Sequence, residues 1–429
     1  MDQELNPRPR LEPLRLGPDQ RLNMKALFEY AARVGASDLL VTAGAPPIVR
    51  VDGDLFPAVD AKLGPEHTKK LIWSLINETQ QEMFERKREL DFSLAVTGEM
   101  RFRANVYYQK GAVAGAFRLI PRVIPQMEDL GVPPMVREMT LRSHGLILVT
   151  GPTGSGKTTT MASMIDLINE TRRCHIVTVE DPIEFIHTNK QGVIDQREVY
   201  ADTLSFANAL KYVLRQDPDV ILVGEMRDVE TIAATITAAE TGHLVIATLH
   251  TNDAIQSIDR IVDVFPPHQH DQIRVQLAFA LIGVVAQQLI PEAEGTGRVL
   301  ATEILIKNHA IAAHIRDGKT HQTRTAMESG RRDGMLTMDY RLKELYEEGR
   351  ISYDEVARRV SSATFMQQIK PPADDDDSLA GEPAPSVEET SISGATVSGT
   401  YSARIEQAQP AKPASKGVFH RFRTGRKDD

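Results

Sequence analysis

The sequence predicts an α/β protein, in which a parallel sheet follows a smaller α+β region. Two observations lead to this prediction. Between about residues 141 and 295, apolar strands alternate with helical segments, which is typical of a parallel sheet covered on both faces. Within that region, residues 151–158 read Gly-Pro-Thr-Gly-Ser-Gly-Lys-Thr, a glycine-rich loop between an apolar strand and a helix. The strands of this sheet are expected at 145–150, 175–180, 219–224 and 244–250.

The smaller region is expected over residues 22–120, after a polar, disordered lead at 1–21. Prolines between residues 121 and 135 indicate a hinge to the parallel sheet. Its helices are expected at 22–34 and from 65 to about 88, and its strands at 38–42, 47–51, 91–95, 100–107 and 115–119, with a turn at 52–54.

After the sheet, residues 309–365 have a helical pattern and residues 366–429 are expected to be a disordered tail. The tail ends in a basic stretch with aromatic residues at 416–427. Such a stretch can contact anionic lipid or a partner, but a solvated tail without a ligand is the more common case.

The bulk composition excludes several classes of protein. Of 429 residues, 41% are hydrophobic and 25% charged, as in soluble globular proteins with two or three domains. A net charge of −9 argues against broad nucleic-acid binding. The single cysteine excludes an intramolecular disulfide and a Cys₄ zinc site. No apolar run has the roughly 20 residues of a membrane span, and no secretion signal is evident. We expect a cytoplasmic protein with at most peripheral membrane contact.

The glycine-rich loop predicts a nucleoside triphosphate site. Its glycines allow backbone N–H groups to surround phosphate oxygens at the start of a helix. Lys157 is expected to reach the β- and γ-phosphates, and the Thr158 hydroxyl to bind Mg²⁺. The expected binding residues are Gly151, Pro152, Thr153, Gly154, Ser155, Gly156, Lys157, Thr158 and Thr159.

Acidic residues follow two of the predicted strands. Side chains just beyond strand ends lie at the ligand crevice of a parallel sheet. Glu180, Asp181 and Glu184 are therefore candidates to orient the attacking water, although such clusters are often solvated turns. Glu225 follows the next strand in the position of a Walker B acid and is expected to reach Mg²⁺ through a water molecule. The alternative for Glu225 is a surface salt bridge with Arg227.

Histidine and arginine side chains complete the predicted site. His250 ends the strand at 244–250 and is a candidate sensor of the γ-phosphate, although a strand-end histidine is more often packed or solvated. Positive charge on the transition state is often supplied by a neighbouring subunit. Because side chains alternate along a strand, Arg101 and Arg103 lie on the same strand face and could both point into a subunit interface. The alternative is that this face of the sheet is simply exposed to solvent. The candidates are Arg101, Arg103, Arg118 and Arg260.

Several of these segments together resemble the secretion ATPase superfamily, and within it the type IV pilus retraction (PilT-like) ATPases. The resemblance spans roughly residues 22–365. Its most specific stretches are Glu180-Asp-Pro-Ile-Glu-Phe185, Gln196-Arg-Glu-Val199, Arg215-Gln-Asp-Pro-Asp219, Gly224-Glu-Met-Arg-Asp228 and Thr248-Leu-His-Thr251. It implies a PAS-like domain at 22–120 and a RecA-like ATPase core at 136–308. It also implies a homo-hexamer that hydrolyses ATP with Mg²⁺.

The resemblance further implies roles for residues and partners. Glu184 is implied to be the water-activating base, Glu225 the Walker B acid, and His243 and His250 members of the histidine box. The arginines named above are implied at the intersubunit nucleotide site. Members work in the cytoplasm at the base of the pilus, on an inner-membrane platform protein, and return pilins to the membrane.

Other functions remain open. Retraction enzymes carry Ala-Ile-Arg-Asn-Leu-Ile-Arg-Glu, where this chain has Ala310-Ile-Ala-Ala-His-Ile-Arg-Asp317, which leaves an accessory, PilU-like role possible. Extension and secretion ATPases usually carry a Cys₄ zinc module, which one cysteine cannot form. A RecA-like motor on nucleic acid conflicts with the negative charge. A module in which the nucleotide only switches conformation conflicts with Lys157, Glu184 and Glu225.

Overall fold

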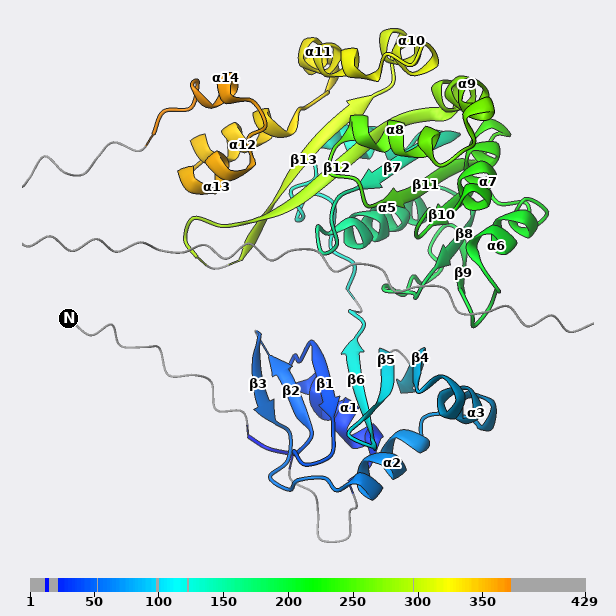
Figure 1. Cartoon of the computed structure of the whole chain (residues 1–429), viewed down its shortest axis with the longest axis vertical. Helices are drawn as coiled ribbons and strands as arrows, with labels where there is room; N and C mark the ends of the chain where they lie inside the picture. Colours follow the sequence, from blue (N-terminus) through cyan, green and yellow to red (C-terminus); the bar gives the residue numbers. More distant parts are fainter. Residues whose placement is uncertain are drawn as a thin grey trace, which may run out of the picture. The chain divides into compact units, whose positions relative to one another are not determined.

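The computed structural model describes residues 12–14, 22–51, 53–97, 100–121, 123–295 and 297–371 (Figure 1). In these ranges no helix combines the length and the apolar character that crossing a membrane requires. Most of the predicted lead, residue 52 of the predicted turn, residues 372–429 of the predicted tail and its basic end lie outside the described residues.

The first sheet is six-stranded and antiparallel, in the order β3-β2-β1-β6-β5-β4. Its strands are β1 (Asp38–Val41), β2 (Ile48–Val51), β3 (Asp54–Pro57), β4 (Glu89–Thr97), β5 (Met100–Gln109) and β6 (Ala112–Leu119). One face packs on helix α1 (Met24–Arg33), where the ring of Phe28 lies 4.3 Å from that of Phe102 and 5.2 Å from that of Phe117. These rings belong to a single hydrophobic core.

The predicted helix from 65 to about 88 is instead two helices, α2 (Pro65–Trp73) and α3 (Glu78–Lys87). The break has a local cause in the capping chemistry of Asn77. Its side chain accepts a hydrogen bond from the Gln80 backbone N–H at 2.9 Å, and the Gln80 side chain accepts one from the Asn77 N–H at 3.1 Å. This reciprocal pair satisfies N–H groups at a helix start, so a new helix begins there.

The second sheet has seven strands in the order β13-β12-β7-β11-β10-β8-β9. They are β7 (Gly145–Thr150), β8 (His175–Glu180), β9 (Val193–Glu198), β10 (Val220–Val223), β11 (Leu244–Leu249), β12 (Leu281–Pro291) and β13 (Arg298–Ile306). All neighbours pair in parallel except β12 and β13, which form an antiparallel edge. The prediction located β7 and β8 correctly and β10 and β11 to within a residue, but it did not include β9, β12 or β13.

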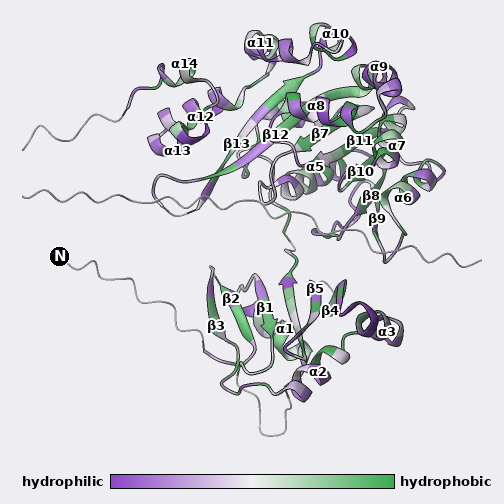
Figure 2. Cartoon of the chain, viewed as in Figure 1, coloured by the Kyte–Doolittle hydropathy of each residue, from purple (hydrophilic) through white to green (hydrophobic). Residues whose placement is uncertain are grey.

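Both faces of this sheet are covered by helices. Successive residues of a strand therefore pack in two different cores, one on each face of the sheet. Leu146 and Leu148 of β7 pack in one core, and Ile147 and Val149 in the other. Helices α6 (Phe206–Val213), α7 (Val229–Glu240), α8 (Ala254–Asp263) and α9 (His270–Ala280) contribute to the first core, and α4 (Pro134–Thr140) and α5 (Lys157–Thr171) to the second. Figure 2 shows the corresponding green colour along the inner strands.

The chain continues beyond the sheet as short helices. They are α10 (His309–Arg316), α11 (Thr323–Ser329), α12 (Met338–Glu347), α13 (Tyr353–Arg359) and α14 (Ala363–Met366), with 3₁₀ turns at Thr320–Gln322 and Gly330–Asp333; a further turn, Pro267–Gln269, precedes α9. Leu342, Val356 and Ile369 bury against the outer part of the β12–β13 hairpin. Ile369 therefore packs in a core, although it lies within the predicted tail.

Candidate nucleotide-binding site

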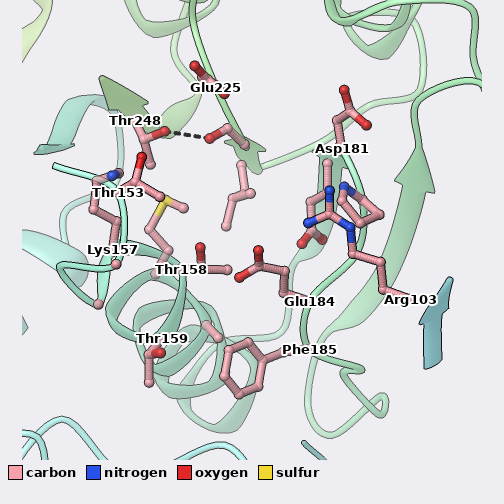
Figure 3. Close-up of a pocket in the computed structure, with 18 of the residues that line it drawn as sticks. Arg103, Thr153, Lys157, Thr158, Thr159, Asp181, Glu184, Phe185, Glu225 and Thr248 are labelled. Carbon is pink, nitrogen blue, oxygen red and sulfur yellow. Dashed lines mark hydrogen bonds between the residues drawn. The ribbon is translucent and has the colours of Figure 1, made fainter. Parts of the chain in front are cut away.

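A pocket of about 500 Å³ lies at the carboxyl ends of the parallel strands (Figure 3). Strands β8, β10 and β11 end at Glu180, Val223 and Leu249, and the residues that follow them face the glycine-rich loop. The lining includes Thr153, Gly154, Gly156, Lys157, Thr158, Thr159, Glu180, Asp181, Glu184, Phe185, His187, Gly224, Glu225, Thr248 and His250. Segments that are far apart along the sequence thus meet in one cavity.

The loop between β7 and α5 requires glycine for both conformation and space. Gly151, Gly154 and Gly156 have φ angles of 143°, 80° and 88°, which side-chain-bearing residues rarely adopt. A Cβ on Gly151 would also lie 2.4 Å from the Gln287 carbonyl oxygen. The loop therefore wraps closely over β12, and its backbone N–H groups precede the first turn of α5.

Lys157 is buried at the start of α5, with only 8% of its surface exposed. Its Nζ donates hydrogen bonds to the carbonyl oxygens of Gly151 at 2.8 Å and Pro152 at 3.1 Å. Burial lowers the pKa of Lys157, whereas the carboxylates of Glu225 and Glu184 act in the opposite direction. The ammonium is thus held by neutral carbonyls near two carboxylates, where an anionic phosphate would be a stronger partner.

Glu225 follows β10 and is paired with a histidine and an arginine side chain. Its Oε1 lies 3.1 Å from His250 Nε2 and 2.5 Å from Arg227 Nε. The predicted Walker B acid and the predicted sensor histidine are therefore in direct contact, across the ends of neighbouring strands. The alternative interpretation, a salt bridge with Arg227, is also present, and it leaves about a fifth of the Glu225 side chain exposed to the pocket.

The two glutamates after β8 have different environments. Burial raises the pKa of Glu180 to about 7, although its carboxylate accepts hydrogen bonds from Thr178 Oγ1 at 2.7 Å, Gln196 Nε2 at 3.2 Å and the Glu184 backbone N–H. Glu184 itself is exposed, and its carboxylate points toward Thr158 in Figure 3. Of the two, only Glu184 has a carboxylate free to meet a water molecule in the cavity.

Comparison with known proteins identifies the family. The family model described as type II/IV secretion system protein matches residues 27–376. The chain belongs to this family.

Individual relatives of the family match over most of their length. The type IV pilus retraction ATPase PilT of Pseudomonas aeruginosa is 45% identical over 79% of this chain and 98% of its own, and the type IV pilus ATPase PilU of the same organism is 38% identical over 81% and 91%. A crystal structure of the pilus retraction motor PilT with bound ADP is 48% identical to this chain and superposes on it with a TM-score of 0.76. The match covers 81% of this chain and all of that structure's chain. The predicted α/β fold class is confirmed, and the chain is an ATPase of this family.

The candidate arginines are divided by the structure. Arg103 and Arg118 are among the residues that line the pocket, whereas Arg101 and Arg260 are not. Arg118 also donates to Asp38 Oδ1 at 2.9 Å, from a mostly exposed position. His243 lies at the opposite end of β11 from His250 and contacts the Ala238 carbonyl oxygen at 2.9 Å, so the two histidines of this family's motif do not share a site.

Several residues of the site were missed by sequence reasoning. Thr248 donates to the Gly224 carbonyl oxygen and fixes β11 to the residue before Glu225. His187 lines the pocket, where burial lowers its pKa to about 4, so its ring is neutral at pH 7. Arg298 of β13 also contributes to the lining. The pairing of strands that are distant in the sequence, such as β10 with β11 for Thr248 and β12 with β13 for Arg298, would have pointed to these residues.

The donor set fits a magnesium ion that arrives with a nucleotide. Within the described ranges, no cluster of three His, Cys, Asp or Glu side chains is suited to hold a metal ion. The pocket instead offers the Thr158 hydroxyl and the Glu225 carboxylate. Mg²⁺ prefers such oxygen ligands, keeps several waters and takes its remaining ligands from phosphates.

Proposed function

We propose that this protein is a homo-hexameric motor that hydrolyses ATP to drive retraction of type IV pili. The supporting observation is that one pocket holds the glycine-rich loop, Lys157, Thr158, Glu184 and Glu225. The 45% identity over nearly all of PilT supports retraction as the work performed.

Binding begins with the phosphates. The loop N–H groups surround phosphate oxygens, and Lys157 exchanges its two carbonyl partners for the β- and γ-phosphates. Thr158 and, through a water molecule, Glu225 would hold Mg²⁺, which would neutralise charge that develops on the phosphate oxygens. Because Glu225 is already paired with His250, a γ-phosphate near Glu225 would also be detected by His250.

Hydrolysis then requires an oriented water molecule. Water attacks the γ-phosphorus while Glu184 accepts its proton, and the bond from that phosphorus to the bridging oxygen breaks to give ADP and phosphate. Glu180 is unsuited to this role, because it is buried and its carboxylate is already occupied by hydrogen bonds from Thr178 and Gln196. Positive charge for the transition state is assigned to the candidate arginines Arg101, Arg103, Arg118 and Arg260.

The partners follow from the same relatives. We place the hexamer in the cytoplasm at the base of the pilus, on an inner-membrane platform protein, with pilins as indirect partners and no nucleic acid. An accessory role is the second candidate, because PilU is 38% identical over 91% of its length. The altered segment Ala310–Asp317 covers most of α10 and the residue that caps it. Arg316 is about half exposed and pairs with Asp317, so a partner can still reach this arginine.

The test is to count surface pili and measure twitching in the host that carries Lys157→Ala. Retraction predicts excess pili on non-motile cells, because assembly continues without disassembly. Bald cells would indicate an extension motor, and normal piliation an accessory one. Arg316→Ala leaves the nucleotide pocket intact. If α10 contacts the platform, this variant should also give excess pili on non-motile cells, but with normal ATP hydrolysis.

A further inference from the structure

We propose that Gln196 is a positioning residue for Glu184, which its side-chain amide holds in place from the neighbouring strand. The inference rests on the proposed role of Glu184 as the base. Gln196 itself is not among the residues that line the pocket, so its action must pass through the loop that carries Glu184.

The sheet brings the two segments together. Strand β9 runs parallel to β8, with Gln196 beside Thr178 and Glu198 beside Glu180. Residues 196 and 198 project on the same face of β9, because side chains alternate along a strand. The chain that leaves β8 at Glu180 passes over this face before it returns toward α5.

Gln196 and Glu198 hold the backbone of that loop at alternate residues. Glu198 Oε2 accepts a hydrogen bond from the Ile183 N–H at 3.3 Å. Gln196 Nε2 donates to the Phe185 carbonyl oxygen at 2.8 Å, and Gln196 Oε1 accepts from the His187 N–H at 2.9 Å. Three backbone groups, on residues 183, 185 and 187, are thus fixed by one face of β9.

This alternation determines where Glu184 points. Ile183 and Phe185 are 4% and 8% exposed, whereas Glu184, between them, is exposed in the pocket. The Glu184 backbone N–H bonds to the Glu180 carboxylate, and that carboxylate also accepts from Gln196 Nε2 at 3.2 Å. The backbone after the proposed base is therefore held directly by the Gln196 amide, and the Glu184 N–H is held through Glu180. The backbone before the base is held by Glu198 of the same strand face.

The chemistry requires an amide at this position. Gln196 donates to two oxygens and accepts from one N–H, so it needs both a donor and an acceptor. A carboxylate would lack the donor and would lie against Glu180. The far end of the loop is held separately, where Asn169 of α5 accepts from the Lys190 N–H and donates to the Thr188 carbonyl oxygen.

The experiment compares Gln196→Met with Gln191→Met in the purified full-length chain. Methionine keeps the length of the side chain and removes its hydrogen bonds. Gln191 is a matched control, because its Nε2 bonds to the Glu170 carbonyl oxygen from an exposed position away from the pocket. The measurements are kcat for ATP hydrolysis, the Kd of a fluorescent ADP analogue, and Tm.

We expect Gln196→Met to lower kcat by about 10- to 100-fold, because a misplacement of about 1 Å costs that much. The Kd should stay within about twofold of wild type, and Gln191→Met should keep the wild-type kcat. If Gln196→Met does not fold, Gln196→Ala, which leaves room for water, takes its place.

Three outcomes would overturn the inference. A kcat equal to that of Gln191→Met would show that the amide does not position the base. A Kd that weakens as much as kcat falls would show that Gln196 shapes the binding surface instead. Glu184→Gln, measured alongside, separates the failure of the two proposals. Full activity in Glu184→Gln would show that Glu184 is not the base. An inactive Glu184→Gln beside a fully active Gln196→Met would show only that Gln196 does not position the base.

Discussion

The two sheets of this protein bury their side chains in different ways. In β10 and β11 of the parallel sheet every residue is buried, whereas in β5 of the antiparallel sheet buried Phe102, Ala104 and Val106 alternate with more exposed residues such as Arg103. Helices cover both faces of the parallel sheet and only one face of the antiparallel sheet. Functional groups of the parallel sheet are therefore confined to its strand ends, while the antiparallel sheet can present them along a whole face.

The most severe way to break this arrangement is to remove the buried charge at the start of α5, beside the strand ends. Lys157→Ala is expected to lower ATP hydrolysis at least 100-fold, because no other ammonium replaces it at the β- and γ-phosphates. Phosphate release from ATP measures the effect. Lys211→Ala, on an exposed position of α6, is the control and should hydrolyse ATP normally. Near-normal turnover in Lys157→Ala would contradict the assignment of the loop.

Adjacent substitutions test the burial pattern itself. In β10, Ile221→Ala and Leu222→Ala should each destabilise the protein by about 2–5 kcal/mol, because both positions lie in cores. In β5, Phe102→Ala should cost about 3–5 kcal/mol, but Arg103→Ala less than about 0.5. Urea unfolding midpoints give the comparison. Equal losses at residues 102 and 103 would show that the antiparallel sheet is covered on both faces.

The buried carboxyl at the end of β8 predicts a dependence on pH. The pKa of Glu180 is raised from 4.5 to about 7, so the folded state binds the proton more tightly than the unfolded state. This stabilisation is complete below pH 4.5 and is lost as pH rises to about 7. Relative to wild type, Glu180→Gln should therefore gain stability between pH 5 and pH 8, on the order of 2 kcal/mol. A Tm difference that does not change with pH would contradict the buried, titrating carboxyl.

A smaller effect than at the core positions is expected at the helix break in the first region. Asn77→Ala should cost about 1 kcal/mol, because the first turn of α3 loses its capping oxygen. Asn77→Ser keeps a capping oxygen and should lose much less. Thermal unfolding monitored by circular dichroism distinguishes the two variants. Equal stability of both would mean that packing, and not the cap, ends α2 before residue 77.

Prediction of the fold succeeded where burial is reflected directly in the sequence. The continuous apolar runs of β7 and β8 located these strands to the residue. Strand β9 has the polar sequence Val193-Ile-Asp-Gln-Arg-Glu198, because it lies at the sheet edge, and it carries little periodic signal. The hairpin of β12 and β13 was missed although both strands are mostly buried and apolar, so burial does not explain this omission.

Prediction of the site shows the same division. Lys157, Thr158, Glu184, Glu225 and His250 were found because each belongs to a short motif or follows a recognisable strand. Gln196, Thr248 and His187 depend on the register between strands, which is a long-range property that the sequence does not display locally. The candidate arginines fall between these cases. The sequence can predict that an arginine is exposed, but it cannot predict how far that arginine lies from the pocket.

The hydrogen bonds around β9 have a consequence for solubility. An edge strand exposes N–H and C=O groups that can recruit a strand from another molecule and start aggregation. Here the Ile194 N–H is taken by the Asn189 side chain at 3.0 Å, and the Glu198 N–H by Asp202 Oδ2 at 2.9 Å. These two short polar side chains occupy two N–H groups of the edge strand, which leaves fewer groups to pair with a strand of another molecule.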